Sequence, residues 1–392
     1  MGSLASRRAV LTAVIALVAF AVVWNTKRCA LCRPSHPGAG NVAQDSQDGA
    51  APHTPMLTPA LSLVHYVGRF DRRDANEAAG ARFSWPGSAV VATFDGTGIV
   101  AKLKDGGTNY FAVVIDRGPA TTLATSGSKE DYVLAEGLPQ GRHTLVLTKR
   151  TEAMVGAVQL LALSPVGGAF VPTPDPYARR IELVGDSITC GYGNLGANAG
   201  CPFTPATEDE TVAYGGLAGR ELGAEVRAIA YSGIGMLRSF DGNTADQMPV
   251  LFERTMAKDP APWTFDTPEP DVVVINLGTN DFAHGDPGAP FAHAYAAFLG
   301  QLRGHYPHAH VICALSPMIL DAPGHMHRTA VRTVLQELVA DRAAAGDAHV
   351  SYFEFDLPRP SEGFGCDFHP STATHRTMAA ALVEEIRART GW

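Results

Sequence analysis

The stretch Glu182–Gly193, ELVGDSITCGYG, decides the fold of the C-terminal half of the chain. An apolar run ends in Gly185-Asp186-Ser187 and continues into a turn that contains further glycines. The run is typical of a buried strand. The serine at its end is then either the cap of a following helix or a nucleophile held on a tight turn. The other strands, and the residues at the end of each of them, discriminate between these interpretations.

Strand-like and helix-like segments alternate through this half. Five apolar runs predict strands, and they read RIELVGD, EVRAIAYSG, DVVVINLGTND, HVICALSP and HVSYFEFD. Between them, helices are predicted over residues 211–222, 291–305, 327–345 and 372–389. Because strands that alternate with helices form right-handed βαβ units, the pattern predicts a three-layer α/β/α domain with a mostly parallel sheet over residues 175–392.

Residues 61–168 have a different pattern. Short strand-like segments are separated by Gly and Asp turns, as in AVVATF, GIVAKLK, YFAVVID, HTLVLTKRT and GAVQLLALS. No apolar stripe of helical period occurs here, and strands at roughly ten-residue spacing are typical of a β-sandwich. An all-β sandwich domain, of the jelly-roll kind, is therefore predicted to precede the α/β domain.

The N-terminus has the features of an export signal. Arg7 and Arg8 precede an uncharged apolar run from Ala9 to Trp24. Residues 1–28 are predicted to be a signal peptide cleaved near Ala21, or an uncleaved anchor that tethers the protein to the membrane. The Pro-, Gly- and Ala-rich residues 29–60 predict a disordered linker. The expected location is outside the cytoplasm: secreted, periplasmic or anchored to the outer face of the cytoplasmic membrane.

Composition and motifs exclude several kinds of partner. The net charge of −8, with no Lys/Arg run, argues against nucleic acid. No glycine fingerprint for a dinucleotide follows a strand, so no cofactor is expected. The histidine-rich segments GHYPHAH and APGHMHRT carry no neighbouring carboxylates in sequence, and no metal site is expected.

Six cysteines are present. Cys29 and Cys32 have no second pair at zinc spacing. In an exported protein some of the four C-terminal cysteines can pair, and Cys190 with Cys201 is the pair closest in sequence. Cys313, inside HVICAL, is interpreted as a buried small apolar residue.

Polar or glycine-rich motifs follow four of the predicted strands. GDS ends the first strand, SGIG the second and LGTND the third, while DFHP follows the fifth after a loop. Each alone is compatible with an ordinary helix cap or turn. Because the carboxyl ends of parallel strands share one edge of a sheet, where ligands bind, the four together predict an active site.

The residue types fit nucleophilic catalysis. Ser187 needs a base to accept its proton, and His369 supplies an imidazole suited to that near neutral pH. A tetrahedral oxyanion then requires fixed donors. The candidates are the backbone N–H groups of Ser187 and Gly233 and the side-chain amide of Asn280.

These motifs resemble the four conserved blocks of the SGNH (GDSL-type) hydrolases, on Ser187, Gly233, Asn280 and His369. The segments FSWPGSAVVATFDGTG, YFAVVIDRG and LPQGRHTLVLTKRTEA are similar to the N-terminal jelly-roll domain of carbohydrate esterase family 2, the family of acetyl xylan esterases. The resemblance implies a serine esterase that removes O-acetyl groups from acetylated polysaccharides such as xylan and mannan through an acyl-enzyme.

One position departs from the superfamily pattern. SGNH enzymes usually carry an aspartate three residues before the histidine, but here that residue is Cys366, and Asp367 lies two before His369. Asp367 is a candidate orienting acid. If it does not contact the imidazole, a backbone carbonyl must fix the tautomer, which is an arrangement known in the resembled family.

Two other functions compete with this interpretation. The first is an SGNH esterase or lipase acting on other acetylated glycans or on lipids; no long apolar lid separates the motifs. The second is a non-catalytic polysaccharide-binding protein, against which the intact set of four residues argues. Trp85 and Trp263 are candidates for stacking on sugars, with a core or domain-interface role at least as well supported for Trp85.

Overall fold

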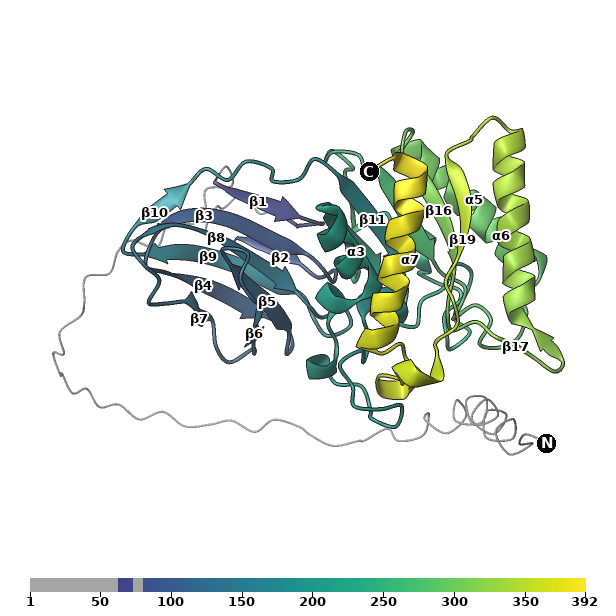
Figure 1. Ribbon diagram of the computed structural model, residues 1–392, viewed down its shortest axis with the longest axis horizontal. Coiled ribbons are helices and arrows are strands. Elements are labelled where there is room, and N and C mark those ends of the chain that lie inside the picture. The colour runs from purple at the N-terminus through teal and green to yellow at the C-terminus, as the bar shows by residue number, and fades with distance from the viewer. Residues whose placement is uncertain (1–62, 73–79) are drawn as a thin grey trace, which may run out of the picture. The chain divides into compact units, whose positions relative to one another are not determined.

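The computed structural model describes residues 63–72 and 80–392 (Figure 1). The predicted signal peptide or anchor (1–28) and the linker (29–60) lie outside these residues. Within the described chain, no helix combines the length and apolar content that crossing a bilayer requires.

A five-stranded sheet forms the centre of the C-terminal half. Its order is β12-β11-β15-β16-β19, and every neighbouring pair is parallel. Each strand lies within one of the five predicted apolar runs; the bounds are β11 Arg180–Gly185, β12 Glu225–Ala230, β15 Val272–Asn276, β16 His310–Leu315 and β19 Val350–Glu354.

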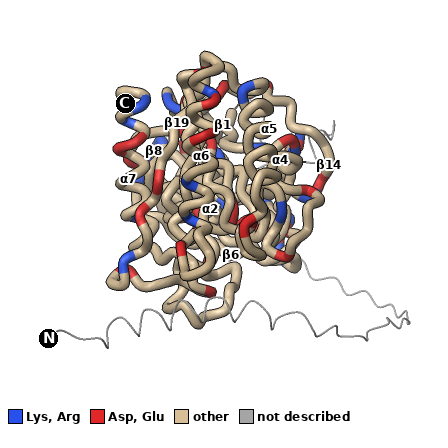
Figure 2. The backbone as a smooth tube through the Cα atoms, turned by 90° about the vertical axis from the view of Figure 1, so that its right-hand side faces the viewer, with Lys and Arg blue, Asp and Glu red and all other residues tan. Residues whose placement is uncertain are grey.

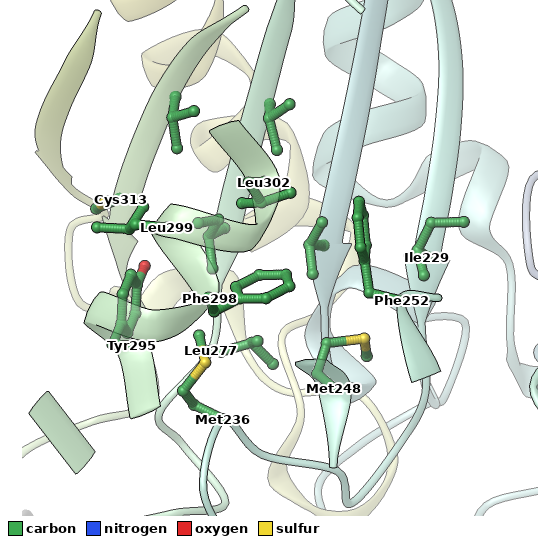
Figure 3. Close-up of a cluster of buried hydrophobic side chains, with 14 of the residues drawn as sticks. Ile229, Met236, Met248, Phe252, Leu277, Tyr295, Phe298, Leu299, Leu302 and Cys313 are labelled. Carbon is green, nitrogen blue, oxygen red and sulfur yellow. The ribbon is translucent and has the colours of Figure 1, made fainter. Parts of the chain in front are cut away.

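Helices cover both faces of this sheet, because successive strand residues point to opposite faces and both sets are apolar. Leu183, Val272 and Val274 belong to the cluster with helices α3 and α7, whereas Val184, Val273 and Ile275 belong to the cluster with α5 and α6. Figure 3 shows part of the second cluster, with Phe298, Leu299 and Leu302 of α5 among its labelled residues. The helix bounds are α3 Tyr214–Leu222, α5 Ala289–His305, α6 His327–Ala344 and α7 Thr372–Thr390.

The predicted helices lie within two residues of these bounds except at the start of α3. A 3-10 turn over Glu210–Val212 replaces the first turn predicted there, and Ala213 is extended (φ −73°, ψ 167°) before the helix begins. The extended Ala213 interrupts helical hydrogen bonding, and neighbouring residues alone do not signal it. Short additional elements in this half are α2 Ser187–Cys190, α4 Met248–Leu251, β13 Arg254–Met256, β14 Asp259–Pro262, β17 Asp321–Ala322 and β18 His325–Met326.

The N-terminal half consists of two antiparallel sheets. One has the order β1-β3-β8-β5-β6 with β10 paired to β3, and the other the order β2-β9-β4-β7. Their inner faces share one core that includes Phe94, Phe111 and Leu160. The strands are β1 Val64–Val67, β2 Ala81–Phe83, β3 Ala89–Gly96, β4 Gly98–Asp105, β5 Tyr110–Ile115, β6 Thr121–Ala124, β7 Asp131–Ala135, β8 Gly141–Lys149, β9 Val158–Val166 and β10 Ala169–Val171. Because β10 pairs with β3, this half extends beyond the predicted limit of residue 168.

Charged residues are interspersed by sign in the view of Figure 2. Many of them form ion pairs, such as Arg328 with Glu354 at 2.8 Å and Arg303 with Asp347 at 3.0 Å.

Two side chains join the halves through their buried surfaces. Trp85 of the N-terminal half lies in the same apolar cluster as Ile229 and Phe252, and its indole N–H donates to the Thr255 carbonyl at 2.9 Å. The Arg69 guanidinium packs over the rings of Phe252, at 4.8 Å, and of Trp263, at 5.5 Å. The two tryptophans that were candidates for sugar stacking therefore both lie at the junction of the halves.

We expect the Trp85→Ala variant to lose about 3–5 kcal/mol of unfolding free energy, because it removes a large buried side chain and leaves a cavity at the junction. Trp85→Phe keeps most of the apolar surface but leaves the Thr255 carbonyl unpaired, at a cost of about 1–3 kcal/mol. Denaturant unfolding followed by circular dichroism measures both. Two variants within about 1 kcal/mol of wild type would contradict the assigned role.

Candidate active site

The predicted nucleophile lies at the carboxyl edge of the sheet. Ser187 begins α2, two residues after the end of β11, and its side chain is largely buried. Asp186 caps this short helix by accepting the Ile188 N–H at 3.0 Å, and Gly191 ends it with φ 77°. Burial raises the pKa of Asp186 to about 7. Asp186 thus holds the turn, as an N-cap residue does.

Strand register brings the other motifs to the same place. Gly185 of β11 is level with Ala230 of β12 and with Asn276 of β15. Gly233 follows three residues after Ala230, and Asn280 four residues after Asn276. The ends of the neighbouring strands β11, β12 and β15 therefore deliver Ser187, Gly233 and Asn280 to the same edge of the sheet.

His369 reaches this edge from the loop before α7. Its Nε2 lies 2.8 Å from the Ser187 Oγ, across 182 residues of sequence. Ser371 begins α7 by capping it, with its hydroxyl accepting the N–H groups of Ala373 and Thr374. The predicted Ser187–His369 pair is brought into direct hydrogen-bonding contact.

A backbone carbonyl, not the predicted carboxylate, contacts the other imidazole nitrogen. The His369 Nδ1 lies 3.1 Å from the Asp367 carbonyl oxygen. The Asp367 carboxylate instead accepts the Tyr192 hydroxyl at 3.0 Å and the Phe203 N–H at 3.1 Å. Asp367 has φ 50°, and at two residues before the histidine its side chain is directed away from the ring. The suggestion that its carboxylate orients His369 is wrong for this structure.

The environment of His369 keeps the imidazole neutral. The Tyr192 ring packs against it with centroids 4.4 Å apart, and Phe203 stacks on the far side of Tyr192 at 4.1 Å. Desolvation lowers the pKa of His369 to about 4, opposed by its contact with the Asp367 carbonyl. At neutral pH the Nε2 lone pair is thus available to the Ser187 proton. Sequence reasoning missed Tyr192, although it lies in the opening GYG.

Candidate donors for an oxyanion lie at the same edge of the sheet as Ser187. Within the described chain, no hydrogen bond engages the backbone N–H of Ser187 or of Gly233. Gly233 adopts φ 80°, a conformation that favours glycine. The Asn280 amide donates one hydrogen to the Ile234 carbonyl at 2.9 Å, and its second hydrogen remains available. The arrangement suits an oxyanion hole.

The Asp281 side chain fixes the loop that carries Gly233. The Asp281 carboxylate accepts the N–H groups of Met236, Leu237 and Arg238 at 2.9, 2.6 and 3.0 Å. The residue after Asn280 thus fixes the same loop that Asn280 contacts. This function of the final residue in GTND was not predicted.

A disulfide bond links Cys201 to Cys366, three residues before His369. The suggested pairing of Cys190 with Cys201 is therefore wrong; Cys190 and Cys313 are buried free thiols. Cys190 lies within α2, whose residues are all buried. The loop of Cys201 instead contacts the loop that carries His369, and the Asp367 N–H donates to the Cys201 carbonyl.

One of the two histidine-rich segments, GHYPHAH, does have carboxylate partners, contrary to the sequence interpretation. His305 contacts Glu253 at 2.8 Å and His308 contacts Glu269 at 3.0 Å. Each is a separate pair. Two groups of potential metal ligands do come together in the described residues; they are His65, Asp175 and Glu225, and Glu152, Cys190 and Glu208. Each group has a buried cation beside it, Arg227 at Glu225 in the first and Lys149 near the two glutamates in the second.

The fold and the site define an SGNH-type serine hydrolase, and residues 183–377 match the GDSL-like lipase/acylhydrolase family. Residues 66–174 match the carbohydrate esterase 2 N-terminal domain. A solved family two carbohydrate esterase from Clostridium thermocellum, in complex with cellohexaose, is 37% identical with a TM-score of 0.80, over 84% of this chain and 99% of that chain. The chain belongs to carbohydrate esterase family 2.

Other relatives support the same family assignment. The cellulase/esterase CelE of Acetivibrio thermocellus is 38% identical over 330 residues, which are 84% of this chain and 40% of CelE, so the chain spans about two fifths of that protein. An acetylxylan esterase / glucomannan deacetylase of Cellvibrio japonicus is 26% identical over 344 residues, 85% of this chain and 93% of that protein. A family two structure from the same organism has a TM-score of 0.75 at 25% identity, over 84% of this chain and 96% of that chain.

The Asp367→Asn variant distinguishes a carbonyl from a carboxylate as the group that orients the imidazole. We expect kcat to stay within about tenfold of wild type, because asparagine keeps the backbone carbonyl and an oxygen for Tyr192 and Phe203. In a triad, replacing the acid by its amide costs about 10⁴-fold in kcat. Steady-state hydrolysis of 4-nitrophenyl acetate measures the change, and a loss near 10⁴-fold would refute the carbonyl arrangement.

The low pKa of His369 predicts an acid-shifted pH profile. The base must be deprotonated, and its pKa lies below the ordinary 6.5, at about 4. We therefore expect kcat/KM at pH 5.5 to remain close to its value at pH 7 and to fall only as the pH approaches 4. Acetate release across this range measures it, with circular dichroism at each pH as the control for unfolding. A midpoint at or above 6.5 would contradict the prediction.

Proposed function

We propose that this chain is a serine esterase that removes O-acetyl groups from polysaccharides of the xylan and mannan type. The observation that carries the proposal is the 2.8 Å contact between Ser187 Oγ and His369 Nε2 on the framework of a carbohydrate esterase family 2 chain. Two of the relatives support the substrate class by their own activities: they are described as acetylxylan esterase / glucomannan deacetylase.

The reaction proceeds in two half-reactions. Ser187 Oγ attacks the acetyl carbonyl while His369 Nε2 accepts its proton, and the oxyanion is held by the N–H groups of Ser187 and Gly233 and the Asn280 amide. The intermediate collapses, and the sugar hydroxyl leaves with the proton from His369. Water, deprotonated by His369, then attacks the acetyl-enzyme and releases acetate and free Ser187. The Asp367 carbonyl holds the imidazole in position throughout.

Several broader features also enter as proposals. The paired antiparallel sheets are assigned the jelly-roll class, supported by the match over residues 66–174. The division into a sandwich domain starting near residue 61 and a hydrolase domain over 175–392 follows the change from antiparallel to parallel pairing. Export, with residues 1–28 as a signal peptide or membrane tether, rests on the apolar run after Arg7 and Arg8.

The Ser187→Ala variant of the full chain tests the function. Acetate release from 4-nitrophenyl acetate, acetylated xylan and acetylated glucomannan is compared for wild type, Ser187→Ala and the control Ser128→Ala, which changes an exposed serine of the N-terminal half. We expect hydrolysis of all three by wild type and the control. Loss of the nucleophile should lower kcat by about 10⁴-fold or more.

The outcomes separate the alternatives. Serine-dependent activity on the small ester alone would replace the polysaccharide by other acetylated glycans or lipids. No serine-dependent activity on any of the three would favour a non-catalytic polysaccharide-binding protein.

A further inference from the structure

The loop Tyr231–Arg238, which carries Gly233, is held by carboxylates from both halves of the chain. Asp281 holds its second part from within the hydrolase half. Its first part is held by Glu152, which follows β8 of the sandwich and lies 80 residues earlier in sequence.

Glu152 contacts the residue immediately before Gly233. One carboxylate oxygen accepts the Ser232 N–H at 2.9 Å, and the other accepts the Ser232 hydroxyl. The Glu152 side chain has no exposed surface. The Gly233 N–H lies on the peptide unit that follows the Ser232 Cα. Fixing the N–H and the side chain of Ser232 therefore fixes that Cα and leaves the ψ torsion of Ser232 as the one soft rotation that sets the direction of the Gly233 N–H.

Glu152 is itself held by a buried network. Its N–H donates to the Glu208 carboxyl at 2.9 Å, and its carbonyl accepts the Lys149 ammonium at 3.0 Å. Lys149 and Glu208 are fully buried. A buried carboxylate is tolerated when it is hydrogen-bonded and its charge is compensated, and Lys149 supplies the compensating charge. Burial raises the pKa of Glu152, and burial with the adjacent Glu152 raises the pKa of Glu208 well above its usual range.

Adjacent contacts fix the same segment to the hydrolase half. Arg150 pairs with Asp209 at 2.9 Å, and the Glu210 N–H donates to the Arg150 carbonyl at 3.1 Å. The backbone two residues before Glu152 is thus fixed to the hydrolase half. These contacts make Glu152 a fixed support rather than a surface residue that happens to touch Ser232.

We propose that Glu152 is a positioning residue for the reaction: through its two hydrogen bonds to Ser232, the sandwich half sets the orientation of the Gly233 oxyanion donor. The proposal rests on the proposed function, and in it Glu152 touches no reacting atom. The N-terminal sheets therefore contribute to the chemistry of small esters as well as of polymers.

The expected effect of losing Glu152 on kcat and KM follows from the step in which the oxyanion forms. Removing an oxyanion donor costs about 10²–10³-fold in kcat, and misdirecting one costs less. Because the charge develops only in the transition state, kcat should fall while KM changes little. We expect about a 10–100-fold loss of kcat when Glu152 loses a hydrogen bond to Ser232.

The test uses Glu152→Gln in the full chain, with Glu136→Gln as the matched control. Glutamine keeps the size of the side chain, but its NH₂ group cannot accept a hydrogen bond from Ser232. Glu136 is an exposed acid of the same half. The measurements are kcat and KM for 4-nitrophenyl acetate, the inhibition constant of an alkylboronic acid that forms a tetrahedral adduct on serine, and the melting temperature.

A positioning role predicts that kcat falls about 10–100-fold in Glu152→Gln, that KM stays within about threefold, and that boronate inhibition weakens in parallel with kcat/KM. Purely structural damage would lower the melting temperature and the active fraction without weakening boronate inhibition of the remaining enzyme. A folded Glu152→Gln protein with wild-type kcat, or with unchanged boronate inhibition, would overturn the proposal.

Ser232→Ala provides a second test, since it removes one of the two hydrogen bonds from the other partner. If Glu152→Gln does not fold, a folded Ser232→Ala with reduced kcat and weakened boronate inhibition supports the proposal, and unchanged values overturn it. Because the assay uses a small ester, failure on acetylated polysaccharide would refute the proposed substrate and leave this comparison intact.

Discussion

The burial of five parallel strands on both faces is the constraint on which the rest of the molecule depends. Apolar side chains of β11 and β15 alternate between two helix-covered faces, which leaves the strand ends as the place for polar groups. Parallel pairing then brings the ends of β11, β12 and β15 level with one another. Ser187, Gly233 and Asn280 meet because of the register of the sheet, and the capped start of α7 brings His369 to them.

The site is divided between two kinds of support. The serine–histidine contact depends on the hydrolase half alone, because Ser187, His369 and the Asp367 carbonyl all belong to it. The oxyanion loop is bounded by carboxylates from both halves, Asp281 and Glu152. Trp85 and Arg69 of the N-terminal half pack against the hydrolase half at the junction between the two.

Local patterns were enough to predict the five strands of the parallel sheet, the longer strands of the N-terminal half, the four long helices and the four site motifs, because apolar periodicity and turn residues act over short distances. The contacts that refine the site act over long distances and left no such signal. In the sequence, Glu152 is one acidic residue after a predicted strand and Tyr192 is part of a glycine-rich turn, and neither pattern indicates the contact that the residue makes. The carbonyl of Asp367, rather than its carboxylate, contacts His369, and this depends on a positive φ that aspartate adopts in few places. The short strands β1, β2, β6, β7 and β10 were also not predicted individually, since three to five residues show little periodicity.

The Cys201–Cys366 bond closes a loop across 165 residues, immediately before the base. In the chain-entropy model, closing a loop of that length stabilises the native state by about 5 kcal/mol. The bond joins the segment that carries Asp367 and His369 to the segment around Phe203, the outer ring of the stack on the imidazole. Oxidation of these two thiols therefore adds a covalent link between the histidine loop and the loop of the outer ring, and such a link forms only where thiols are oxidised.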